Sequence, residues 1–229
     1  MSEKILQIID LKKNYNDKPI LTGINLCVKN GELLGMLGEN GAGKTTLIKC
    51  ILGLADYDSG TVKLNTTNIG FIPENYGIWD YLTGREYITF IGKLWGITEN
   101  NLKLILDEFP KMLNFDDILD KPIYAYSKGN KEKIMVTIAF GCNPHVIFFD
   151  EPFSGLDPIV SRVERKIMKE FCKNGGTIFL NTHHLELAEK ICTRVCILKG
   201  GQIAFDGNID DVMDKGGLEE VYFEFYDPL

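Results

Sequence analysis

The 229-residue sequence has no long apolar run and no excess of basic residues. Its apolar stretches all fall short of the roughly 18 uninterrupted residues typical of a membrane-spanning helix. Charges are scattered through its first 15 residues, which does not fit the apolar core of a signal peptide. The formal net charge of −7 argues against a nucleic-acid partner, because phosphate contacts need clustered Lys and Arg. We therefore expect a cytoplasmic protein that binds no nucleic acid.

Paired cysteine motifs are also missing. None of the six cysteines forms a CxxC pair. Cys192 and Cys196 are four residues apart, downstream of His183 and His184, so a zinc site is the weaker of two interpretations. Because zinc sites usually show tighter paired spacings, we favour reduced, mostly buried thiols.

The organisation along the chain predicts one domain over residues 1–229. No tandem repeat, low-complexity tract or flexible linker interrupts it. Strand-like runs and turns fill the part up to about Val62, and helical periodicity follows over about 76–140. Beyond that, strand-like and helix-like segments alternate, which is typical of a mainly parallel sheet wrapped by helices. We expect the helical section to be inserted into this α/β fold.

The most specific local motif is a glycine-rich loop. Residues 38–45 read GENGAGKT and match GxxxxGK[ST] between a strand-like and a helix-like segment. A turn that binds nothing is the alternative, but the fixed positions match by chance in only about one chain in a hundred of this size. We expect Lys44 to reach the phosphates of a nucleotide and Thr45 to bind Mg²⁺. The predicted ATP-binding residues of the loop are Gly38, Asn40, Gly41, Ala42, Gly43, Lys44, Thr45 and Thr46.

A second motif is the apolar run Val146–Phe149, which ends in Asp150 and Glu151. Alone it is weak evidence, since many buried strands end in an acidic residue. Downstream of a phosphate loop, it predicts that Asp150 holds Mg²⁺ through water and that Glu151 is the general base.

Several further segments resemble the motifs of the ABC ATPases. Residues 126–131, YSKGNK, are similar to the family's signature motif, LSGGQ, and Ser127 is suited to cap a following helix. The other resemblances are Glu151–Asp157 to the stretch from Walker B to the D-loop, Thr182-His183 to the switch histidine, Tyr15 to the adenine-stacking aromatic, Phe71–Glu74 to the Q-loop, and Leu218–Phe223 to the usual C-terminal end.

This resemblance implies a P-loop NTPase core with a mainly parallel sheet, an N-terminal antiparallel β subdomain and an inserted helical subdomain. It also implies a dimer, either homodimer or heterodimer, that sandwiches ATP and Mg²⁺ between the phosphate loop of one copy and the signature of the other. The implied signature residues are Ser127, Lys128, Gly129 and Asn130, and the implied D-loop residues are Ser154, Gly155, Leu156 and Asp157. The implied catalytic residues are Glu151 and His183, with Thr45, Glu74 and Asp150 at the metal and Tyr15 at the adenine.

Blander interpretations compete with some of these roles. His183 is also suited to a polar position at a strand end, and Tyr15 to surface packing. Ser154 and Asp157 also suit the cap of the following helix, since Pro158 fits a helix start.

Three positions depart from the family pattern. Glu74 stands where glutamine is usual, and a carboxylate cannot donate an amide hydrogen bond. Lys128 replaces the first signature glycine, and Asn130 replaces the glutamine. A similar variant is common in ATPases that serve exporter-type membrane subunits, so the resemblance favours export.

The sequence therefore predicts the ATP-hydrolysing subunit of an ABC transporter, peripheral on the inner face of the cell membrane and bound to separate transmembrane permease subunits. The alternatives are a soluble ABC ATPase not involved in transport, another class of P-loop enzyme, and a non-catalytic scaffold. A GTPase is disfavoured because residues 130–133, NKEK, lack the aspartate of NKxD. The transported substrate is not readable from the chain. Candidate contacts with the permease, which suit a core position equally well, are Tyr76, Ile78, Trp79 and Tyr81.

Overall fold

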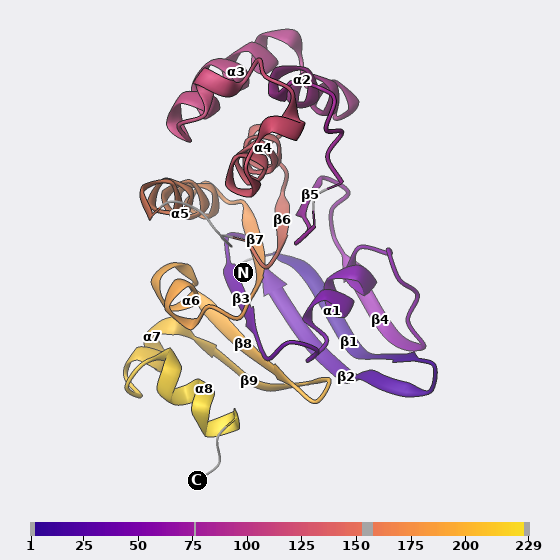
Figure 1. Ribbon diagram of the computed structural model, residues 1–229. Helices are drawn as coiled ribbons and strands as arrows, with labels where there is room; N and C mark the ends of the chain where they lie inside the picture. Colours follow the sequence, from indigo (N-terminus) through magenta and orange to yellow (C-terminus); the bar gives the residue numbers. More distant parts are fainter. Residues whose placement is uncertain (1–2, 76, 153–157, 227–229) are drawn as a thin grey trace.

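The centre of the computed structural model, which describes residues 3–75, 77–152 and 158–226, is a six-stranded sheet (Figure 1). The strand order is β5-β6-β7-β3-β8-β9, and every neighbouring pair is parallel except β8 with β9. The strands are β3 (Leu33–Leu37), β5 (Ile69–Ile72), β6 (Val146–Asp150), β7 (Thr177–Thr182), β8 (Arg194–Lys199) and β9 (Gln202–Asn208). The predicted α/β class with a mainly parallel sheet is confirmed.

Both faces of this sheet are covered. In β3, Leu33 and Leu37 belong to the cluster packed against α4, α5 and α6, whereas Leu34 and Met36 belong to the cluster packed against α1 and the N-terminal strands. Successive side chains of a strand point to opposite faces. Burial on both faces explains why the parallel strands are continuous apolar runs in the sequence.

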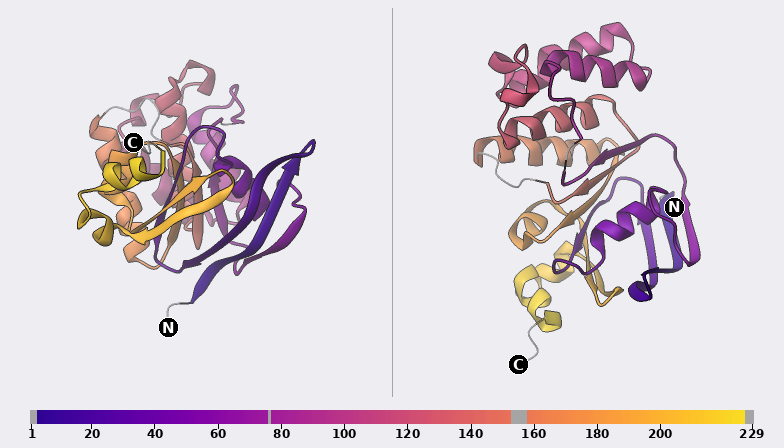
Figure 2. Two further views of the ribbon diagram at one scale, coloured as in Figure 1. Left: turned by 90° about the horizontal axis from the view of Figure 1, so that it is seen from below. Right: turned by 45° about the vertical axis from the view of Figure 1, so that its right-hand side comes forward.

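The N-terminal strands form a separate antiparallel sheet of order β2-β1-β4, as predicted. It contains β1 (Lys4–Tyr15), β2 (Lys18–Lys29) and β4 (Ser59–Leu64). Asn16 and Asp17 close the β1–β2 hairpin with φ of 47° and 63°, a left-handed conformation that Asn and Asp tolerate better than most residues. Figure 2 shows this sheet and α5 on opposite sides of the six-stranded sheet.

The helices around the sheet divide between its two faces. Helix α1 (Lys44–Ile51) shares a hydrophobic cluster with the three-stranded sheet. The other face is covered by α5 (Pro158–Lys173) and α6 (Leu185–Ile191), with α7 (Ile209–Met213) and α8 (Leu218–Tyr226) beside them. None of the helices within the described ranges combines the length and apolar character that a membrane crossing requires.

The helical section lies at one end of the molecule, away from α7 and α8 (Figure 1). It holds α2 (Gly84–Leu94), α3 (Glu99–Met112) and α4 (Lys128–Gly141), with 3₁₀ turns at Asp116–Ile118 and Ile123–Ala125. Thr83 and Glu86 form a reciprocal capping box at the start of α2. The section is inserted between β5 and β6, which are neighbours in the sheet, and its division from the core as a subdomain over about 76–140 stays a prediction.

The cysteines are free, and five of the six are buried, as expected; Cys27 is partly exposed. Burial raises the pKa of the Cys172 thiol to about 12 and raises the pKa of the Cys192 thiol as well. Within the described ranges, no group of three or more His, Cys, Asp or Glu residues could hold a metal ion.

Candidate nucleotide site

The glycine-rich loop connects β3 to α1, so it lies at the carboxyl edge of the parallel strands. Gly41 and Gly43 have φ of 86° and 107°, and a Cβ at Gly43 would come within 3.0 Å of Leu21. Gly43 is also the N-cap of α1 and offers no side-chain cap, so the first-turn N–H groups are available to an anion. The loop thus has the backbone conformation of a phosphate cradle.

Lys44, at the first position of α1, is turned back over the loop and is 5% exposed. Its Nζ donates to the carbonyl oxygens of Gly38 at 2.6 Å and Glu39 at 3.2 Å. The same ammonium lies 3.4 Å from Glu151 Oε1. The buried cation is therefore satisfied by acceptors that a phosphate could replace.

Two neighbouring strands bring an acidic group against α1. Asp150 ends β6 and is 4% exposed. Its Oδ1 accepts hydrogen bonds from Thr45 Oγ1 at 3.1 Å and from Asn181 Nδ2, on β7, at 3.0 Å. These donors hold the carboxylate beside the hydroxyl of Thr45, as the predicted metal site requires.

Glu151 follows β6 with φ of 55°, an uncommon conformation for a non-glycine residue that is typical of functional sites. Its N–H donates to Asn181 O at 3.0 Å, which holds this backbone conformation. Glu151 Oε2 accepts from His183 N–H at 3.2 Å and lies 2.7 Å from His183 Nδ1. One carboxylate thus joins Lys44 of α1 to His183 after β7.

Lys44, Thr45, Glu151 and His183 line a cavity of about 510 Å³, whereas Asp150 lies outside its lining. Its walls carry the ammonium groups of Lys44 and Lys128 and the N-terminus of α1, which are suited to an anion, together with the carboxylates of Glu39, Glu74 and Glu151. The size is in the range of small-molecule sites. The lining residues are Ile20, Glu39, Asn40, Gly41, Gly43, Lys44, Thr45, Thr46, Glu74, Lys128, Glu151 and His183.

Most of the predicted loop and catalytic residues meet in this cavity, but some predicted residues lie elsewhere. Tyr15 is outside the cavity lining, 45% exposed, with Lys13 Nζ 4.7 Å from its ring centroid. Ala42 lines an adjoining cavity instead, and Gly38 lies outside the lining but accepts the hydrogen bond of Lys44. Ile20 lines both cavities, and sequence reasoning missed it because an apolar strand residue carries no signal for a ligand.

The signature segment starts α4. Ser127 is its N-cap and accepts a hydrogen bond from Asn130 N–H at 3.2 Å, as expected. Lys128 lines the cavity of its own chain, whereas Ser127, Gly129 and Asn130 do not. The predicted D-loop residues Ser154, Gly155, Leu156 and Asp157, and the predicted docking residue Tyr76, lie outside the described residues.

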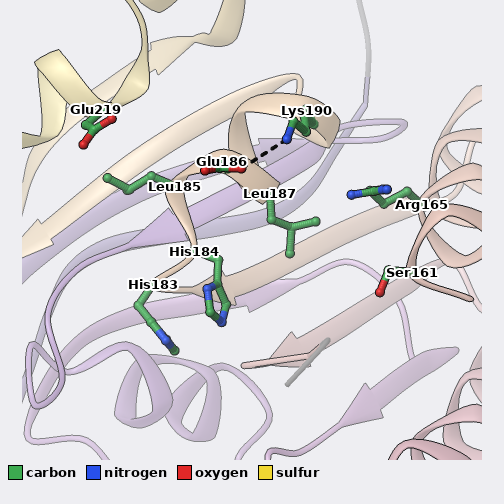
Figure 3. A pocket seen from close by; sticks show the side chains of 9 residues that line it. All are labelled: Ser161, Arg165, His183, His184, Leu185, Glu186, Leu187, Lys190 and Glu219. Carbon is green, nitrogen blue, oxygen red and sulfur yellow. Dashed lines mark hydrogen bonds and ion pairs between the residues drawn. The ribbon is translucent and has the colours of Figure 1, made fainter. Parts of the chain in front are cut away.

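A second cleft, of about 550 Å³, adjoins the site at His183. Figure 3 shows His183 and His184 side by side before α6, with Ser161 and Arg165 of α5 across the cleft. The two imidazole rings are 4.1 Å apart between centroids. His184, to which the sequence assigns no role, therefore packs against the predicted switch residue.

The oxygen groups near Thr45 fit Mg²⁺, which prefers one or two carboxylates together with water and substrate phosphate. Thr45 Oγ1 and the Asp150 carboxylate are already adjacent, and Glu74 lines the same cavity. Asn181 Oδ1 is buried and has no hydrogen-bond partner among the described residues, so this oxygen can accept a further donor.

Comparisons with known proteins agree with this geometry. The model of the ABC transporter family matches residues 21–154. The chain is 35% identical over 222 residues to an uncharacterized ABC transporter ATP-binding protein of Methanocaldococcus jannaschii, covering 97% of this chain and 83% of that protein. It is 37% identical over 202 residues to YthP of Bacillus subtilis, an uncharacterized ABC transporter ATP-binding protein, covering 88% and 86% of the two chains.

Solved structures show the same fold. The structure of an ATP-binding subunit of an ABC transporter superposes with a TM-score of 0.90 at 30% identity, covering 96% of this chain and 98% of that chain. An ATP-binding cassette in its ADP conformation superposes with a TM-score of 0.79 at 20% identity, covering 97% and 99%. At that identity the second likeness concerns the fold alone.

Proposed function

This chain belongs to the ABC transporter family as an ATP-binding subunit that hydrolyses ATP, and from that premise we propose that it powers export through separate membrane permease subunits. The observation that carries the proposed site is the linked group of Lys44, Glu151 and His183 at one cavity. In this proposal the triphosphate of ATP occupies that cavity.

Phosphate binding would rearrange Lys44. Its ammonium would exchange the carbonyl oxygens of Gly38 and Glu39, and the carboxylate of Glu151, for the β- and γ-phosphate oxygens. Glu151 Oε1 is buried and, apart from this ion pair, has no hydrogen-bond partner among the described residues, so it would then be available to a water molecule. ATP binding itself therefore prepares the base.

Hydrolysis in this arrangement is an in-line displacement. The water oxygen attacks the γ-phosphorus, its proton passes to the Glu151 carboxylate, and the bond to the leaving oxygen of ADP breaks. His183 would hold the Glu151 side chain through Nδ1 and face the γ-phosphate from the cavity wall. Thr45, Asp150 and Glu74 would hold Mg²⁺, which neutralises charge on the β- and γ-oxygens.

Two copies of the ATPase, identical or different, would close over the nucleotide. Ser127 and Lys128 are exposed at the start of α4, so this helix N-terminus is accessible to the γ-phosphate of a second copy. Donors on both sides of the γ-phosphate would hold the copies together until hydrolysis. The D-loop residues 154–157 would lie at the same dimer contact.

The permease subunits would dock on the helical section and place the ATPase at the inner face of the membrane. Tyr81 is 91% exposed and Trp79 is 56% exposed, and the Trp79 ring lies 4.9 Å from Phe90. Aromatic side chains of this kind are enriched in protein interfaces. Ile78 is partly buried against the core and would support them. The proposal of export rather than import depends on Lys128 and Asn130, the two signature positions that resemble exporter-type ATPases.

The test of the ATPase mechanism is Glu151→Gln. ATP affinity should stay within about threefold of the wild type, turnover should fall by roughly 10²–10⁴, and ATP should trap a dimer that light scattering detects. Glu108→Gln, a matched change at an exposed position of α3, should behave as the wild type. Full turnover by Glu151→Gln would remove Glu151 from the role of base.

Export is tested with the membrane partner present. The wild type should co-purify from membranes with a multi-spanning protein, and Trp79→Ala with Tyr81→Ala should reduce that recovery. In cells that carry Glu151→Gln, an exported compound should accumulate inside relative to the wild type. Depletion of a compound inside the cells would indicate import, and recovery without any membrane protein would favour a soluble ATPase.

A further inference from the structure

The C-terminal helix α8 contacts the phosphate loop through the side chain of Tyr226. Tyr226, at its last position, donates from its hydroxyl to Leu198 O at 2.7 Å and accepts from Glu39 N–H at 3.4 Å. Burial raises the pKa of Tyr226, so the phenol keeps its proton and remains a donor. A residue 187 positions from Glu39 in the sequence thus contacts the first turn of the loop.

The peptide group that Tyr226 touches is the one that holds Lys44. The N–H of Glu39 and the C=O of Gly38 belong to the same planar unit. The N–H donates to Tyr226, while the C=O accepts from Lys44 Nζ at 2.6 Å. Rotation of this peptide would move both groups together, so the orientation that Tyr226 favours is also the one that places the acceptor of Lys44.

The surroundings fix this contact from both sides. A Cβ at Gly38 would lie 2.5 Å from Leu198 O and 3.4 Å from Tyr226 Oη, so the backbone packs directly on the pair. On the helix side, Tyr226 stacks on Tyr222 with ring centroids 4.5 Å apart. The ammonium of Lys199 lies 5.5 Å from the Tyr226 ring centroid and bonds Phe225 O, the last turn of α8.

We propose that Tyr226 is a positioning residue for nucleotide binding, which sets the Gly38–Glu39 peptide and through it the resting place of Lys44. The C-terminal helix is then part of the nucleotide site, although it lies outside the matched residues 21–154. This inference rests on the assignment of the phosphate site to residues 38–46. It predicts that a change at α8 alters ATP affinity rather than the chemical step.

The test is Tyr226→Phe, which removes the hydroxyl and keeps the ring. The dissociation constants for ATP and ADP, measured by fluorescence titration, should rise about 3- to 10-fold. KM for ATP should rise in parallel while kcat stays within about twofold. Tyr124→Phe, the same change at a 65% exposed residue, is the control and should leave all of these constants unchanged.

Thermal unfolding separates positioning from simple structural support. A lower unfolding temperature with both dissociation constants within twofold of the wild type would overturn the inference. If Tyr226→Phe does not fold, the same dissociation constants are measured for Lys199→Met. They should rise by a smaller factor than for Tyr226→Phe, and unchanged constants would contradict the inference. If the Lys44→Ala variant bound ATP with the affinity of the wild type, the assignment of the phosphate site itself would be overturned.

Discussion

Two clusters of buried charge in this protein are built in opposite ways. At the nucleotide site, Lys44, Asp150 and Glu151 all have partners, and the cluster opens onto a cavity. Between α4 and α5, Glu132 and Glu164 are each 1% exposed, with Lys133 beside them. Both oxygens of Glu164 are buried and make no hydrogen bond to any described residue.

The two clusters balance their charge by different means. At the nucleotide site the carboxylates are stabilised by fixed donors and a cation, and an incoming anion can replace some of these contacts. In the cluster of Glu132, Lys133 and Glu164, which we call the sealed cluster, burial and then the charge of Glu132 raise the pKa of Glu164 to about 9, while Lys133 opposes the shift. Glu164 therefore carries a proton at neutral pH. The charges at the nucleotide site are thus paired beside a cavity, whereas the buried carboxyl of Glu164 is neutralised by its proton.

The largest expected effect is on the accessible cluster. Lys44→Ala removes the cation that would contact the β- and γ-phosphates, so ATP affinity should fall by about 100-fold or more. Isothermal titration with ATP measures this. Lys49→Ala changes an exposed lysine of the same helix and should bind ATP normally. Equal affinities for the two variants would place the phosphates elsewhere.

The sealed cluster should respond in the opposite sense. Glu164→Gln removes the ionisation that burial opposes, so it should raise the free energy of unfolding at pH 8 by roughly 1–3 kcal/mol. Urea denaturation checks this, with Glu170→Gln, an exposed change on the same helix, as the control. A loss of stability at pH 8 would mean that Glu164 is held ionised.

The difference in free energy of unfolding between Glu164→Gln and the wild type should depend on pH, because of the same pKa shift. The folded chain keeps the Glu164 proton up to about pH 9, whereas the unfolded chain releases it near 4.5. The favourable contribution of Glu164 is thus complete below about pH 4.5 and is lost as the pH rises towards 9. The advantage of Glu164→Gln should therefore grow between these values, and a flat difference would contradict the assigned shift.

The smallest effect is expected for a charge pair exposed to solvent. Arg85 Nε lies 2.6 Å from Asp120 Oδ1, with the two side chains 46% and 69% exposed, and the bond lowers the pKa of Asp120. Its contribution is present above the ordinary pKa of the carboxyl and is lost as the pH falls. Asp120→Asn should shift the unfolding temperature by less than about 2 °C at neutral pH and still less in high salt. A larger shift would show that geometry outweighs solvent screening here.

Local signals explain how much of the site was predictable. The glycines and Lys44 of the phosphate loop lie within eight consecutive residues, so the motif is readable from the sequence. Asp150 and Glu151 are readable because they come directly after an apolar strand. The hairpin at Asn16 and Asp17 and the capping box at Thr83 and Glu86 also depend on neighbouring residues, but hydrophobic periodicity does not detect them. The short strand β5 was not predicted, because its last residues belong to the segment Phe71–Glu74 that was interpreted as the Q-loop.

The amino-acid order alone specifies a phosphate loop and an acidic strand end in a parallel α/β order, because each is encoded by residues close together in the chain, and the resemblance to the family predicts His183 as the switch residue. Which of these groups are in contact depends on the folded arrangement. It placed Glu151 between Lys44 and His183, buried Glu164 beside Glu132, and brought Tyr226 to Glu39. The physical reason is that such contacts depend on how strands order in the sheet and helices pack on its faces, which the period and spacing of residues leave open.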